Sequence, residues 1–169
     1  MKSIVTQKGV NSMLLLVDTS NLYFCTNKRF PGQKIDYAKY VDNVLKDFGD
    51  IDQPIAYVSQ SKNEGIGFMK YLKAVGFDVV VKRPYRKKVH NDYIFYTNWN
   101  AEMAYATAKA QPTVIGSSAV EIYPVLEHLY KQTQVYVYAS GIPESFKNVT
   151  TSVREIEADI MKDAKLSSE

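Results

Sequence analysis

Short apolar runs alternate with amphipathic stretches along most of the chain. Met13–Val17 is apolar at every position, which is typical of a strand buried on both faces of a parallel sheet. Four further strand-like runs are Ile55–Val58, Phe77–Val81, Thr113–Ile115 and Val135–Tyr138. Apolar residues recur at helical spacing in the intervals 35–48, 61–75, 98–110 and 120–131. This alternation predicts βαβ units and therefore a three-layer, Rossmann-like α/β fold.

The 169 residues suffice for one domain with a hydrophobic core. We expect residues 1–12 to form an N-terminal extension, 13–157 the domain, and 158–169 a flexible, charged C-terminal tail. A short edge strand over 153–156 would bring the central, mainly parallel sheet from five strands to six, with helices on both faces. Ser118 and Glu121 form a capping-box pattern at the start of the helix over 120–131.

The composition favours a cytoplasmic protein without membrane contact. No apolar run is long enough to span a membrane, and the first dozen residues lack the pattern of a signal peptide. The single cysteine, Cys25, excludes an internal disulfide and suits a reducing compartment. The 13 tyrosines are either base-stacking surfaces or amphipathic core residues.

The first strand leads directly into Asp18, and Asn21 follows three residues later. Ligands of open parallel sheets bind at the carboxyl ends of the strands, so this carboxylate is a candidate metal ligand or general base. Either role requires partners. In the alternative interpretation, Asp18 caps the turn that follows it or bonds to Asn21.

Positive charge is concentrated in one segment. Five cations lie within residues 82–88 of a chain whose net charge is +3, so the remainder is slightly acidic. Aromatic residues at 85, 93, 95 and 96 accompany them. Cations bind phosphates and aromatic rings stack on unpaired bases. The candidate nucleic-acid contacts are Lys82, Arg83, Tyr85, Arg86, Lys87 and Lys88, and the alternative is a solvated surface run.

Five segments carry a resemblance to a known family. They are Asp18–Tyr23, Lys34–Tyr37, Phe68–Val79, Asn98–Ala104 and Ser117–Pro124. In this order they resemble the NYN domain, a branch of the PIN-like nuclease superfamily, and most closely its bacterial LabA-like members. The resemblance implies a PIN/NYN type of Rossmann-like fold. It also implies a metal-dependent ribonuclease, in which carboxylates hold Mg²⁺ or Mn²⁺ against an RNA phosphodiester.

The acidic positions of the family are only partly kept. Asp18 and Asn21 match the family pattern, and Glu102 is a further family position that adds an acid if it faces the cleft. Other family aspartates are replaced by Asn100, Ala106, Ala119 and Glu121. An amide oxygen coordinates a cation without contributing charge, and alanine contributes neither a ligand atom nor a charge. Glu121 is alternatively the acidic partner of Ser118 in the capping box, which we favour.

The sequence therefore predicts a nuclease-like, RNA-binding protein whose catalysis is weakened or absent. Its vestigial or remodelled site would comprise Asp18, Asn21, Asn100, Glu102 and Glu121, with Asp18 and Glu121 as weak metal ligands. We expect no tightly bound cofactor, and an active form would need Mg²⁺ or Mn²⁺. Two alternatives stay open: an active ribonuclease with a remodelled one-metal site, and an assembly protein that binds a protein partner or forms a homo-oligomer.

Overall fold

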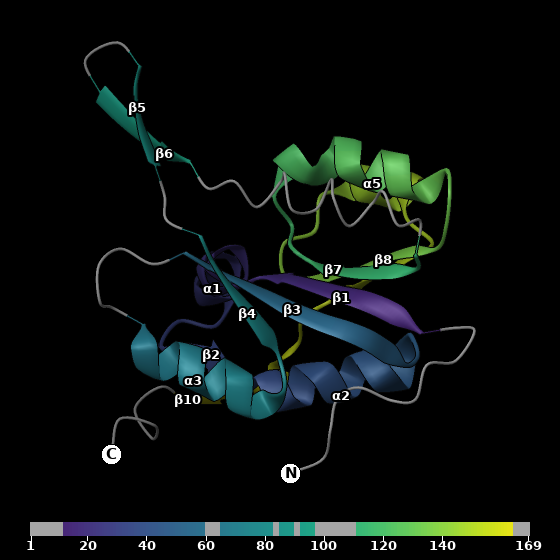
Figure 1. Ribbon diagram of the computed structural model, residues 1–169, viewed down its shortest axis with the longest axis horizontal. Helices are drawn as coiled ribbons and strands as arrows, with labels where there is room; N and C mark the ends of the chain where they lie inside the picture. The colour runs from purple at the N-terminus through teal and green to yellow at the C-terminus, as the bar shows by residue number, and fades with distance from the viewer. Residues whose placement is uncertain (1–11, 60–64, 83–84, 90–91, 97–110, 164–169) are drawn as a thin grey trace.

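A six-stranded parallel sheet forms the centre of the computed structural model (Figure 1). The structure describes residues 12–59, 65–82, 85–89, 92–96 and 111–163. In spatial order the strands are β4 (Asp78–Lys82), β3 (Ile51–Ser59), β1 (Met13–Asp18), β7 (Thr113–Gly116), β8 (Val135–Ala139) and β9 (Ser152–Glu155). Every neighbouring pair is parallel. The predicted α/β class and Rossmann-like architecture are confirmed.

Helices cover both faces of this sheet. α2 (Tyr37–Asp47) and α3 (Ile66–Val75) lie on one face, and α5 (Tyr123–Tyr130) lies on the other (Figure 1). The apolar face of α2 is buried, and the Asp36 carboxylate caps its first turn by accepting from two backbone N–H groups. Gly76 ends α3 with φ 121°, a backbone conformation that glycine adopts without strain. None of the described helices is long and apolar enough to cross a membrane.

β1 is a central strand of the sheet, and its apolar run is buried as predicted. Leu15 and Val17 are both 0% exposed, because strands lie on either side and helices cover both faces. The chain first adds β3 and β4 on one side of β1 and then adds β7, β8 and β9 on the other. The strand order thus reverses between β1 and β7. Doubly wound sheets bind ligands at such a switch point, so the ends of these two strands are the first place to expect a site.

α1 (Thr19–Arg29) lies where the apolar pattern predicts no helix. Its buried positions are Thr19, Leu22 and Thr26, so two of the three inward side chains are threonines. The Thr19 hydroxyl donates to the carbonyl of Tyr57, and the Thr26 hydroxyl donates to that of Leu22. These bonds satisfy the buried hydroxyls inside the protein. A helix with a polar inward face has no apolar period, and therefore the sequence pattern did not reveal it.

The segment after β4 forms a hairpin. β5 (Tyr85–Val89) pairs with β6 (Asp92–Tyr96) in antiparallel register. Figure 1 shows the hairpin beyond the end of β4 and outside the six-stranded sheet. β5 holds three consecutive cations, Arg86–Lys88, so it lacks the apolar run that marks the core strands. The helix predicted over 98–110 lies outside the described residues.

The chain is folded against the domain as far as Asp163, so the predicted flexible tail is wrong for residues 158–163. η3 (Ala158–Ile160) leads into β10 (Met161–Asp163), which pairs antiparallel with β2 (Gln33–Ile35). Ile160 is 1% exposed. Charged residues flank the buried pair Ile160 and Met161, so the sequence around them shows no apolar run that would predict their burial.

Among the residues whose burial the structure describes, four tyrosines belong to the core: Tyr37, Tyr40, Tyr57 and Tyr138. The rings of Tyr40 and Tyr138 stack with their centroids 4.3 Å apart. The Tyr40 hydroxyl donates to the backbone carbonyl of Tyr138 at 2.7 Å, so its polar end is satisfied inside the core. For these residues, the interpretation as amphipathic core residues is confirmed.

Candidate functional site

Asp18 lies at the carboxyl end of β1 and caps the N-terminus of α1. Its Oδ1 accepts a hydrogen bond from the backbone N–H of Asn21 at 3.2 Å. Burial raises the pKa of Asp18 from 3.8 to about 6, while the backbone N–H groups of Asn21 and Ser20 favour the charged form and oppose that rise. The capping contact that the sequence offered as the alternative to metal ligation is therefore present.

Asn21 joins α1 to the loop that follows β7. Its Oδ1 accepts from the backbone N–H of Ser118 at 2.9 Å and from the Ser118 hydroxyl at 3.2 Å. The Ser118 Oγ also lies 3.3 Å from the Cys25 Sγ. The Ser117 hydroxyl oxygen accepts from the backbone N–H of Ala119 at 3.2 Å. These contacts form a polar network across the switch point, in which the Asn21 amide oxygen bonds to protein donors.

We expect Asn21→Ala to lower the free energy of unfolding by about 1–3 kcal/mol, because the Ser118 N–H loses its acceptor in a partly buried site. Urea unfolding followed by circular dichroism measures this change. Asn27 is exposed on the same helix, and Asn27→Ala is expected to change the stability by less than about 0.5 kcal/mol. Equal effects of the two substitutions would show that the bonds to Ser118 do not stabilise the fold.

Glu121 is exposed, and the predicted capping box is wrong. The short 3₁₀ segment η1 (Val120–Ile122) precedes α5, and its N-cap residue Ala119 makes no side-chain capping bond. Ser118 is only 7% exposed, and its hydroxyl bonds to Asn21 and contacts Cys25 instead of capping a helix. The pattern failed because Ser118 is held by a residue distant in sequence, which a local motif does not reveal.

The described side chains do not fit a divalent cation. Within the described ranges, no three Asp, Glu, His or Cys side chains are grouped so that they could hold a metal ion. Mg²⁺ and Mn²⁺ sites need several oxygen ligands with carboxylate charge, whereas Asp18 caps a helix and the Asn21 oxygen accepts from Ser118. Asn100 and Glu102 lie outside the described residues, and Glu121 is exposed on η1.

The basic candidates cluster along the hairpin. Lys82 ends β4, and Tyr85, Arg86, Lys87 and Lys88 lie in β5. Positions 86 and 88 pair with positions 95 and 93 of β6. Opposite positions of an antiparallel pair share one face, so two cationic and two aromatic positions share a face of this hairpin. Arg83 lies outside the described residues.

Sequence reasoning missed the part played by three residues near the switch point: Cys25, Ser117 and Ser118. Ser117 and Ser118 directly follow a buried strand, which is the rule that singled out Asp18, so the same argument applied to β7 would have found them. Cys25 carries no such signal, because only the unpredicted helix α1 brings it to Ser118.

No model of a known protein family matches this chain, and no curated protein matches it. Among solved structures, the chain is similar to the crystal structure of a protein of unknown function from Vibrio parahaemolyticus. The two superpose with a TM-score of 0.72 over 92% of this chain and 100% of that chain, at 17% sequence identity. At this identity the similarity shows a shared fold. The resemblance to NYN domains stays a prediction.

Proposed function

We propose that this protein is an NYN-like, nuclease-like protein that binds RNA and whose catalysis is weakened or lost. One observation carries the proposal: Asp18 lies at the topological switch point as a helix cap, without two acidic partners among the described residues. The location suits a nuclease-like cleft, and the carboxylate's surroundings do not suit tight metal binding.

The cause of the raised pKa of Asp18 supports the loss of a metal site. In a set of carboxylates arranged for a cation, each acid raises the pKa of its neighbours by like-charge repulsion. Here the pKa of Asp18 rises through burial, and among the described groups no other acid contributes to the rise. Two family aspartates are replaced by Ala106 and Ala119, which is consistent with this account.

The hairpin supports RNA as the ligand. Its register places cationic positions 86 and 88 on one face with aromatic positions 95 and 93. Cations bind phosphates with release of counterions, and aromatic rings stack on unpaired bases. A single-stranded RNA offers both phosphates and unpaired bases, so it is the ligand whose chemistry suits this face best.

Fluorescence anisotropy with a labelled single-stranded RNA tests the proposal. We expect binding at 50 mM salt that weakens as salt rises, with a log–log slope of about −0.7 for each phosphate contacted. Removal of Mg²⁺ with EDTA should leave the affinity for RNA unchanged, because contacts between Lys or Arg side chains and phosphates need no metal ion. Absence of binding at low salt would contradict the proposal and would favour the assembly interpretation, which light scattering then tests.

A further inference from the structure

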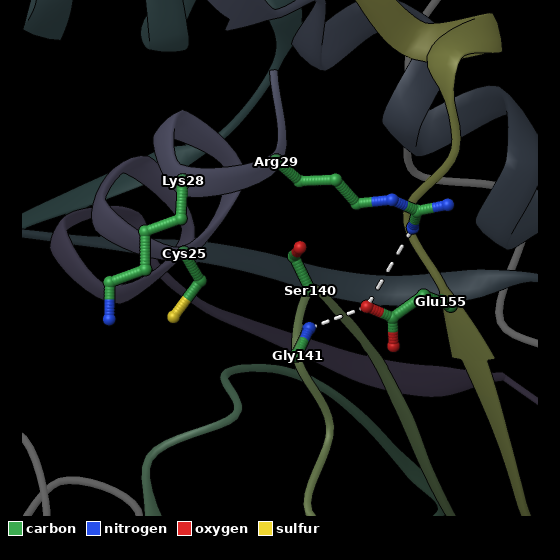
Figure 2. A pocket seen from close by; sticks show the side chains of 6 residues that line it. All are labelled: Cys25, Lys28, Arg29, Ser140, Gly141 and Glu155. Atoms are coloured by element: carbon green, nitrogen blue, oxygen red, sulfur yellow. Dashed lines mark hydrogen bonds and ion pairs between the residues drawn. The ribbon is translucent and has the colours of Figure 1, made fainter. Parts of the chain in front are cut away.

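A cavity of about 340 Å³ lies between α1 and the ends of β8 and β9 (Figure 2). It is lined by Cys25, Lys28, Arg29, Ser140, Gly141 and Glu155. This volume falls within the range of small-molecule sites, which begins at about 300 Å³. The carboxyl edge of a parallel sheet is also where such sites form. None of the lining residues belongs to the basic hairpin, so an occupant here goes beyond the proposed function.

The charges on one side of the cavity are already paired. The Glu155 carboxylate accepts from two consecutive backbone N–H groups, the first being that of Gly141. Arg29 Nη1 lies 3.9 Å from the same carboxylate, and Arg29 Nη2 donates to Glu157 at 2.8 Å. This side therefore holds an acid whose acceptors are satisfied by the protein itself.

The donors on the other side have no partner among the described residues. Ser140 is 2% exposed, yet no described residue hydrogen-bonds to its hydroxyl, although buried hydroxyls normally have a partner. The Lys28 ammonium likewise forms no ion pair with a described residue. In Figure 2, Ser140 lies in the middle of the lining residues, with Lys28 and Cys25 on one side and Arg29 and Glu155 on the other. Lys28 is exposed and solvated, so the buried Ser140 hydroxyl is the donor that an occupant of the cavity would satisfy.

We propose that the cavity binds a small organic molecule that carries a phosphate group. Lys28 provides a compact positive charge suited to phosphate, and the Ser140 hydroxyl provides a buried donor. Arg29 is paired with Glu155 and Glu157, so Lys28 is the lining cation that stays available for a phosphate. The volume exceeds the need of a lone phosphate ion, and therefore the rest of the molecule fills the space beside Cys25.

The thiol of Cys25 gives a direct test, because it lines the cavity and is the only cysteine in the chain. Alkylation by N-ethylmaleimide, an uncharged reagent, measures access to the cavity without activity as a readout. We expect 5′-AMP to slow the alkylation severalfold, and adenosine at equal concentration and ionic strength to leave the rate unchanged. Equal protection by adenosine, or no protection by 5′-AMP, would overturn the proposal.

Two variants test the donors. Lys28→Gln and Ser140→Ala are each expected to raise the 5′-AMP concentration for half-protection by about tenfold, the loss typical of a hydrogen bond to a charged group. Lys39 is exposed on α2 and does not line the cavity. In the Lys39→Gln variant, 5′-AMP should therefore protect the Cys25 thiol at the same concentration as in the wild type. Thermal unfolding checks that each variant is folded. Wild-type affinity in both cavity variants would show that the cavity does not recognise phosphate through these donors.

Discussion

Asp18→Asn is expected to raise the free energy of unfolding at pH 8 and to change it little at pH 4. Burial raises the pKa of Asp18 from 3.8 to about 6, so the fold favours the protonated carboxyl. That preference stabilises the protein fully below pH about 4, and the stabilisation is lost as the pH rises through about 6. Asn is neutral throughout, and it is as good an N-cap residue as Asp, so the contact with the Asn21 N–H is kept.

The size of this effect follows from the pKa. The difference between 3.8 and about 6 corresponds to about 3 kcal/mol, and partial exposure of Asp18 reduces it, so we expect a gain of about 1–3 kcal/mol at pH 8. Urea unfolding at pH 4, 6 and 8 measures the gain and its pH window. Asp42 is exposed on α2, and Asp42→Asn, which makes the same change of side chain at the surface, is the control variant in this series. A loss of stability in Asp18→Asn at pH 8 would mean that the charged carboxylate has a stabilising partner that this account lacks.

Reversal of two charges on the same hairpin face, Arg86→Glu with Lys88→Glu, is expected to weaken binding of single-stranded RNA by about 100-fold at low salt. Two charged contacts contribute about 1.5 kcal/mol each at the low end of the usual range, and 1.4 kcal/mol corresponds to a factor of ten. The slope of log affinity against log salt should fall by about 1.4, because two phosphate contacts are lost. Fluorescence anisotropy over a salt series measures both quantities.

The matched control is a double charge reversal on α3, outside the hairpin. Lys70 and Lys73 are exposed on α3, and Lys70→Glu with Lys73→Glu alters the net charge of the chain equally. We expect this pair to weaken binding only slightly, because general electrostatic attraction is partly screened by salt. A similar loss in both double variants would assign the binding to net charge rather than to the hairpin.

The fold was predictable from the sequence because its core strands are buried on both faces. Such strands are uniformly apolar, as Met13–Val17 shows, and they stand out without any knowledge of their neighbours. Elements with other kinds of packing were missed. α1 buries Thr19, whose hydroxyl bonds to the carbonyl of Tyr57, and β10 follows a buried Ile160 set among charged residues and pairs with β2. In both, the stabilising contacts lie with distant partners and leave no local apolar period.

The candidate site was predictable in place but not in detail. The rule for parallel sheets located Asp18 at the strand end, and the strand order adds that β1 and β7 meet at the switch point. The bonds between Asn21 and Ser118 join residues 97 positions apart, so no local motif gave them. The failed capping box has the same origin, because the Ser118 side chain bonds across the switch point and not within its own segment.

We propose, as the central claim, that the protein binds RNA through its basic hairpin without cutting it efficiently. Incubation of labelled single-stranded RNA with the protein, with and without Mn²⁺, tests this claim most directly on a denaturing gel beside a native one. We predict a shifted band on the native gel and intact RNA on the denaturing gel in both conditions. Mn²⁺-dependent cleavage by the wild type that is absent in Asp18→Asn would contradict the account and establish an active, remodelled metal site.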